Sequence, residues 1–267
     1  MGKLGLCLSG GGGRGAYQIG ALVALKELGI LDKVSYYSGT SIGSVNAVMV
    51  ATSSLENAKN IWLNIPDDSL KKNENFFKEI KEEGYKIYKS GLYEMDLLEE
   101  ILTNNIDINK LKIDDVFIAI GDGGDSNEGF KLLRNTYKHY IKKESRIVYQ
   151  GLKGLTQEEA IEAVRMSCAI PLVFPSVIKD GKKYYDGGVY DNVPVEPLVR
   201  VGCDEIIVVH LHKIHFFRPK KYPDVLFHEI KHKGLLGSIL DFSKEHSHKL
   251  YEYGYNDVMC YYSEEGK

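Results

Sequence analysis

Ser41 is the residue whose sequence surroundings most clearly suggest chemistry. It stands at the centre of residues 39–43, which read GTSIG and match the G-x-S-x-G pattern of a nucleophile elbow. In such an elbow a sharp turn between a strand and a helix exposes the serine hydroxyl, and Gly39 and Gly43 let neighbouring backbone approach closely. The amides at the start of the next helix then face the site. A serine that only caps a helix would match the same pattern.

A glycine-rich stretch, residues 10–15 (GGGGRG), is the second candidate. It also matches G-x-G-x-x-G, the fingerprint of a dinucleotide site, which needs an acidic residue at the end of the next strand. The strand expected there ends in residues 36–39 (YYSG), without an acid. Free amides in such a loop can instead hold the oxyanion that develops when a serine attacks an ester. A non-catalytic nucleotide-binding or lipid-binding module stays open as an alternative.

The general base for Ser41 is not evident among the histidines. The histidines stand at positions 139, 210, 212, 215, 228, 232, 246 and 248, and none lies in a turn that marks it as the base. Only two expected strands precede Ser41, so the Ser, Asp, His order of an α/β-hydrolase fits poorly. Asp186, within residues 185–188 (YDGG), is the other candidate. An aspartate is a weak base, with a pKa of about 3.9 in model peptides. To accept the proton of Ser41, its pKa would have to be raised by desolvation, or the pKa of the serine would have to be lowered by nearby amides and a helix dipole.

Residues 228–232 (HEIKH) suggest a different chemistry. H-E-x-x-H on a helix places two imidazoles on one face for zinc, so His228 and His232 would be ligands and Glu229 the general base of a zinc peptidase. The longer form of this motif fails, because Leu235 and Ser238 stand where glycine and histidine are required. We keep the zinc peptidase as an alternative and expect no metal at the serine site.

These residues must be positioned by an alternation of strands and helices. Strands are expected over residues 3–8, 34–37, 116–120 and 205–211, extended segments over 130–150, and helices over 16–28, 42–52, 156–168 and 235–253. The alternation predicts a mostly parallel sheet covered by helices. Asp180-Gly181 marks a hairpin turn just before Asp186. No linker or charge block divides the chain, so we expect one domain over residues 1–267.

Composition excludes several classes of protein. The chain has 267 residues, 43% of them hydrophobic, and a net charge of −3, so no basic field points to nucleic acid. No run of about 18 apolar residues could span a membrane, and no signal peptide is evident. Four scattered cysteines form no C-x-x-C pair and are expected to be reduced thiols. We expect a cytoplasmic protein, with peripheral membrane contact through residues 71–93 and 212–233, which are rich in aromatic residues and lysine.

The three motifs around Arg14, Ser41 and Asp186, in this order, resemble the patatin-like phospholipase family. Residues 166–175 (MSCAIPLVFP) and 191–197 (DNVPVEP) resemble the stretches on either side of that family's catalytic aspartate. The resemblance implies a three-layer α/β/α fold in which Ser41 is the nucleophile and Asp186 the general base. It implies an oxyanion hole built from the amides of Gly11, Gly12, Gly13 and Arg14. The glycines that support the motifs are Gly10, Gly15, Gly39, Gly43, Gly187 and Gly188.

The activity implied is that of a lipid acyl hydrolase, a phospholipase A, lysophospholipase or related carboxylesterase, without a cofactor. The serine would form an acyl-enzyme that water then hydrolyses, and the substrate would be a phospholipid or another fatty-acyl ester. The resemblance is loose over residues 56–150, and residues 56–113 are the candidate for a variable helical cap. One departure is Gly13, where many members carry a larger residue, and a more flexible loop is expected there.

Overall fold

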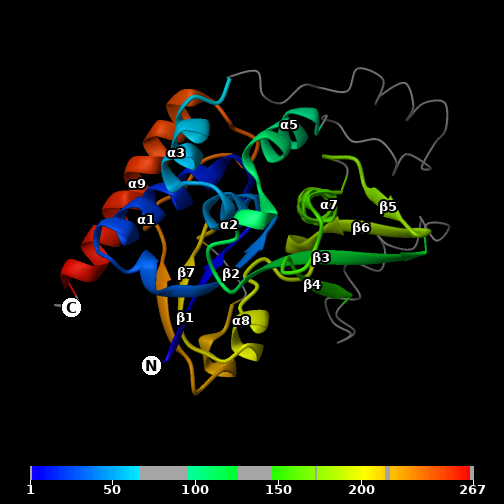
Figure 1. The fold of residues 1–267 in the computed structure, drawn as a ribbon. Coiled ribbons are helices and arrows are strands. Elements are labelled where there is room, and N and C mark those ends of the chain that lie inside the picture. The colour runs from blue at the N-terminus through cyan, green and yellow to red at the C-terminus, as the bar shows by residue number, and fades with distance from the viewer. Residues whose placement is uncertain (1, 67–94, 126–145, 172, 214–216, 265–267) are drawn as a thin grey trace.

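One mixed sheet forms the centre of the molecule. The computed structural model describes residues 2–66, 95–125, 146–171, 173–213 and 217–264. Within these residues the sheet has eight strands in the order β5-β6-β3-β2-β1-β7-β8, with β4 paired along β3 (Figure 1). The strands are β1 (Lys3–Leu8), β2 (Val34–Thr40), β3 (Asp115–Asp125), β4 (Ile147–Gly151), β5 (Val177–Lys179), β6 (Lys182–Asp186), β7 (Cys203–Val209) and β8 (Leu226–Ile230).

The strands that lead into the glycine loop and into Ser41 run parallel, whereas β6, which ends in Asp186, is antiparallel to both of its neighbours. β1 pairs in parallel with β2 and β7, β2 with β3, and β7 with β8, whereas β4, β5 and β6 form antiparallel pairs. The carboxyl ends of β1 and β2 therefore lie side by side, and these ends lead into the glycine loop and into Ser41. The mostly parallel sheet and the hairpin before Asp186 are confirmed.

Helices cover both faces of the sheet, which confirms the three-layer α/β/α architecture. They are α1 (Gly15–Glu27), α2 (Ile42–Thr52), α3 (Leu55–Leu63), α5 (Asp96–Asn105), α7 (Gln157–Cys168), α8 (Glu196–Arg200) and α9 (Lys244–Glu264). Leu6 and Leu8 of β1 pack into the larger core, to which every one of these helices except α8 contributes. Cys7 points to the opposite face, into a second core with Leu198 of α8. Figure 1 shows α1 and α9 side by side.

The end of the chain differs from the sequence prediction. The helix expected over residues 235–253 is wrong in its start, because α9 begins only at Lys244. Within the expected helix, Gly237 takes a φ of 77°, which breaks a helix before Lys244. Residues 226–230, which precede this segment, form a strand that was not expected. Extended structure is confirmed at β4, while residues 126–145 and 67–94 lie outside the described residues. Two helices, α3 and α5, flank the latter gap within the expected cap.

Within the described residues, no helix is long and apolar enough to cross a membrane. The lysine-rich and aromatic stretch at residues 71–93 lies outside them, and the stretch at 212–233 is described except for 214–216.

Candidate active site

Ser41 occupies a strained turn between β2 and α2. Its backbone has φ 54° and ψ −127°, and it is one of two described non-glycine residues with positive φ. Such a conformation is costly and persists only where the surroundings impose it. At Gly43 a Cβ atom would lie 2.1 Å from the Leu8 carbonyl oxygen, so a side chain there would separate α2 from β1. The elbow expected from GTSIG is therefore formed.

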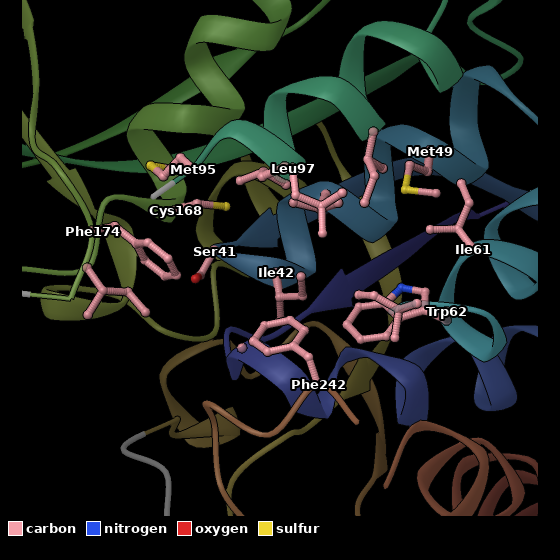
Figure 2. A pocket seen from close by; sticks show the side chains of 16 residues that line it. Ser41, Ile42, Met49, Ile61, Trp62, Met95, Leu97, Cys168, Phe174 and Phe242 are labelled. Carbon is pink, nitrogen blue, oxygen red and sulfur yellow. The ribbon is translucent and has the colours of Figure 1, made fainter. Parts of the chain in front are cut away.

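Both the N–H and the carbonyl group of Ser41 form hydrogen bonds with other residues. Its N–H donates to Ser167 Oγ at 2.9 Å, and that hydroxyl donates to the Ala119 carbonyl at 2.7 Å. The Ser41 carbonyl accepts from the Ser44 hydroxyl at 2.6 Å. Its own side chain lines an apolar pocket, as Figure 2 shows. The backbone bonds thus fix the turn and leave the hydroxyl facing the pocket.

Asp186 ends β6 with a buried carboxyl group. One oxygen, Oδ1, accepts the Gly188 N–H at 2.7 Å, while Oδ2 is buried without a hydrogen-bond partner among the described residues. Burial raises the pKa of Asp186 to about 6, although the Ser41 hydroxyl and the Gly188 N–H both favour the charged form. The Asp186 carboxylate is therefore a stronger base than an ordinary aspartate, which is what a general base for Ser41 would need.

The glycine loop, residues 10–15, passes beside Ser41. A Cβ atom at Gly10 would lie 3.3 Å from Ser41 Cβ, and Gly12 lines the same pocket as Ser41. The Gly13 N–H donates to the Ile239 carbonyl at 2.8 Å, and the Arg14 N–H to the Gly11 carbonyl at 3.3 Å. The amides of Gly11 and Gly12 have no acceptor within the described part of the chain. Of the four amides expected in an oxyanion hole, these two are available to a ligand.

A C-terminal strap, residues 237–242, lies against this loop. Arg14 Nε donates to the Gly237 carbonyl at 3.0 Å, and Arg14 Nη1 to the Leu211 carbonyl at 3.0 Å. At Gly13 a Cβ atom would lie 2.1 Å from the Asp241 carbonyl oxygen. This oxygen belongs to the backbone, so it cannot rotate away from a new side chain as a flexible side-chain atom could. The strap therefore explains why position 13 is glycine, and it holds the loop by hydrogen bonds where a flexible loop was expected.

The pocket beside Ser41 is apolar and part of it is open to solvent. Its empty space, counted together with the open solvent at its mouth, is about 790 Å³. The lining residues are Gly12, Ser41, Ile42, Val45, Met49, Ile61, Trp62, Ile65, Met95, Leu97, Leu98, Ile101, Cys168, Ile170, Phe174 and Phe242. The rings of Trp62 and Phe242 stack with centroids 6.1 Å apart. The Trp62 indole N–H donates to Asn46, so its polar edge is already paired. Such a lining suits a hydrocarbon chain.

The zinc peptidase alternative fails on geometry. Residues 226–230 form a strand, so His228 and His232 do not share the face of a helix as H-E-x-x-H requires. His228 Nε2 lies 2.8 Å from Glu205, and His232 Nδ1 lies 2.8 Å from Asp257, so the two rings have different carboxylate partners. The described residues contain no group of three or more side chains arranged to hold a metal.

The dinucleotide alternative also lacks support. The Gly13 amide, which belongs to the G-x-G-x-x-G pattern, is taken by Ile239 of the strap. The expected acidic residue after the second strand is absent, since β2 ends at Thr40 and leads directly into Ser41. The loop is therefore better placed to serve Ser41 than a pyrophosphate.

Sequence reasoning did not identify the residues that hold the site together. Ser167 was noted only within MSCAIPLVFP, and a serine near the end of a helix carries no signal of its partner in another element. The strap falls in a segment that was expected to be helical. The glycine at position 13 was the one available signal, because an unusual glycine often marks a close backbone approach.

A family model and several curated proteins are similar to this chain in sequence. A family model described as patatin-like phospholipase matches residues 6–199. Lysophospholipase NTE1 of Cryptococcus neoformans var. neoformans serotype D is 27% identical over 230 residues, which are 83% of this chain and 12% of that protein. An uncharacterized protein of Acanthamoeba polyphaga mimivirus is 29% identical over 198 residues, 71% of this chain and 59% of that one. The chain thus spans a small part of the length of the lysophospholipase that it matches.

A solved structure shares the fold. VipD from Legionella pneumophila superposes with a TM-score of 0.54 at 13% sequence identity, covering 98% of this chain and 67% of that chain. At this identity the likeness concerns the fold alone.

Proposed function

The chain belongs to the patatin-like phospholipase family, whose model matches well over half of its residues, and on this premise we propose that it hydrolyses fatty-acyl esters of lipids. Ser41 is the nucleophile and Asp186 the general base. The similarity to lysophospholipases favours a phospholipid or lysophospholipid substrate. A related carboxylesterase activity belongs to the same proposal, since the chemistry at the ester is shared.

One observation carries this proposal. The Ser41 hydroxyl stands at an apolar pocket and interacts with the buried Asp186 carboxyl group, whose Oδ2 has no hydrogen-bond partner among the described residues. With a pKa of about 6, this carboxyl group is ionised at neutral pH and still basic enough to accept a proton in the transition state. A purely structural aspartate would have both oxygens paired, because an unpaired buried carboxylate is costly.

The chemistry follows from these positions. Ser41 Oγ attacks the ester carbonyl carbon as its proton moves to Asp186, and the carbonyl oxygen gains the negative charge. The amides of Gly11 and Gly12 and the N-terminal end of α2 stabilise that oxyanion. Asp186 then protonates the departing alcohol and leaves an acyl-enzyme. Water, deprotonated by the same carboxylate, releases the fatty acid and restores Ser41.

The apolar pocket holds the acyl chain in this proposal. Ile42 and Val45 of α2 line it from Ser41 onward, and Met49 lines it one helical turn further along. Figure 2 places Ser41 and Met49 well apart along this lining. Burial of methylene groups favours binding by about 0.8 kcal/mol each, which makes a fatty chain the natural occupant. The alcohol part of the ester would stay toward solvent.

A cytoplasmic location with peripheral membrane contact remains part of the proposal. Lys231 and Lys233 are exposed and close in sequence to Leu235, which is 82% exposed. Lysines beside an exposed leucine suit an anionic lipid surface.

The test is hydrolysis of a series of fatty-acyl esters, from short to long, in excess chelator. Wild type is compared with Ser41→Ala, and His228→Ala serves as a matched control for the zinc alternative. We expect turnover by wild type and by His228→Ala, and none by folded Ser41→Ala. Turnover that survives in Ser41→Ala, or that chelator abolishes, would refute the proposal.

A further inference from the structure

The last turn of α7 bonds to the backbone of both proposed catalytic residues. Ser167 Oγ accepts the Ser41 N–H at 2.9 Å. Two residues later, the Ala169 carbonyl accepts the Asp186 N–H, also at 2.9 Å. Ser41 follows β2 and Asp186 ends β6, so the two come from strands that are not adjacent in the sheet. One short turn of a third element therefore connects them.

The Ser41 amide depends on an acceptor from outside its own helix. Ser41 precedes the first residue of α2, so its N–H has no partner in the hydrogen-bond ladder of that helix. Ser41 is only 5% exposed, which leaves little access for water. A buried amide without an acceptor is strongly disfavoured. The oxygen of Ser167 is thus what makes the strained conformation of Ser41 tolerable.

The orientation of the Ser167 hydroxyl is fixed as well. Ser167 is fully buried, and its single proton is donated to the Ala119 carbonyl at 2.7 Å. A lone pair of the oxygen therefore faces Ser41. Ala119 lies on β3 opposite Thr40 of β2, and the next residue along β3 lies opposite Asp186 of β6. The hydroxyl is anchored at the point of the sheet where the two catalytic strands meet β3.

We propose that Ser167 is a positioning residue, which holds Ser41 in its strained conformation and, through the last turn of α7, fixes its separation from Asp186. This inference rests on the proposed function. Ser167 does not line the pocket and so acts through Ser41, without contact to substrate. Its loss lowers kcat and the reactivity of Ser41, while substrate affinity is retained.

The experiment compares full-length wild type with Ser167→Ala. Four quantities are measured: kcat and KM on a fatty-acyl ester, the rate of labelling by an alkyl fluorophosphonate, and hydrogen exchange of the peptide that contains Ser41. We expect kcat and labelling to fall by about ten- to hundredfold, the loss of one buried hydrogen bond, with KM within about twofold. Exchange at the Ser41 amide accelerates. Ser247→Ala, at a fully buried serine of α9, is the matched control and changes none of them.

A folded Ser167→Ala protein with wild-type kcat and wild-type exchange would overturn the inference. If that variant does not fold, Ser167→Thr is compared with Ser167→Val, which has the same shape without the hydroxyl. At least about tenfold higher activity for threonine supports the role, and equal activity overturns it. If wild type hydrolyses no ester, the proposed function fails. Exchange at Ser41 then decides the positioning role: acceleration in Ser167→Ala supports it, and no change overturns it.

Discussion

The two halves of the candidate site are held in different ways. The elbow half, Ser41 and Asp186, is hydrogen-bonded to Ser167 of α7 and to Ala169, the residue that follows α7, and all of these residues fall within the stretch that matches the family model. The loop half, residues 10–15, is bonded to the strap at residues 237–242, which lies beyond that stretch. The residues that hold the elbow half by hydrogen bonds thus lie inside the matched stretch, and the strap that holds the loop half lies outside it.

This difference separates two tasks. In the proposed mechanism, proton transfer needs Ser41 and Asp186 at a fixed distance, which the sheet and the end of α7 supply. Oxyanion stabilisation needs amides that stay free, and here the strap takes the Gly13 amide while leaving those of Gly11 and Gly12. Elements outside the family model can therefore change the second task without disturbing the first. Variants in each half should differ in what they change.

The largest effect is expected from Asp186→Asn in the elbow half. The amide cannot accept the Ser41 proton, so kcat falls by about 100-fold to 10,000-fold, and the fold is kept. Steady-state kinetics and circular dichroism check this. Activity close to wild type would show that another base serves Ser41 and would refute the dyad.

The same variant should change how stability depends on pH. The pKa of Asp186 is raised from 3.8 to about 6, so the folded protein binds this proton more tightly than the unfolded chain does. The contribution of this group to the free energy of unfolding is therefore full below pH 3.8 and is lost as pH rises toward 6. Asp186→Asn lacks this fall. Urea unfolding at several pH values between 4 and 8 measures how the free energy of unfolding changes with pH. The same pH dependence in both proteins would contradict this prediction.

A smaller effect is expected from Gly13→Ala in the loop half. The new methyl group would lie 2.1 Å from the Asp241 carbonyl oxygen, so the strap or the loop must move. Displacement of the Gly11 and Gly12 amides should lower kcat by about 100-fold, the scale of losing one oxyanion donor. Gly29→Ala is the control, because Gly29 has φ 66° and open space around it. It should lower the melting temperature and leave kcat unchanged. Equal kcat in Gly13→Ala and wild type would show that the strap does not position the amides that stabilise the oxyanion.

The pH profile should separate the two halves. The value of kcat/KM is expected to fall about tenfold per pH unit below the pKa of Asp186, about 6, and to be flat above it. Gly13→Ala lowers the plateau and keeps the same apparent pKa, because the displaced amides do not titrate. Initial rates between pH 4.5 and 8.5 provide the test. A shifted pKa in Gly13→Ala would mean that the two halves are coupled.

The elbow half could be predicted from sequence because its signals are local. The buried strand ending at Thr40, the glycines around Ser41 and the Asp180-Gly181 hairpin before Asp186 each follow from a few neighbouring residues. Parallel pairing of β1 with β2 then places the glycine loop beside Ser41, and the antiparallel pairing of β6 with β3 brings Asp186 to the same part of the sheet. Ser167 could not be found in this way, since its partner Ser41 is distant in sequence and a buried serine has no pattern of its own.

The loop half could be predicted only in part for the same reason. The apolar residues Leu235, Leu236, Ile239 and Leu240 have a spacing that suggests a helix, yet Leu235 is 82% exposed in the structure. Contacts of Ile239 and Asp241 with the glycine loop determine the backbone there. Likewise, residues 226–230 form a strand because β8 pairs with β7, and that pairing cannot be recognised from the five-residue HEIKH motif.

The smallest effect is expected from Phe242→Ala, at the end of the strap. Phe242 stacks on Trp62 at 6.1 Å and lines the pocket, so the strap contributes to the acyl site as well as to the loop. Losing one aromatic contact is worth about 0.5–1.5 kcal/mol, so KM for long-chain esters should rise by about two- to tenfold. Short-chain esters and kcat should change little. The control is Phe227→Ala on β8, since Phe227 packs in the second core on the opposite face of the sheet. It should lower stability without altering the preference for chain length. If Phe242→Ala instead lowered kcat for all esters alike, the strap would act only through the glycine loop. Phe242 would then have no part in the selection of substrates by chain length.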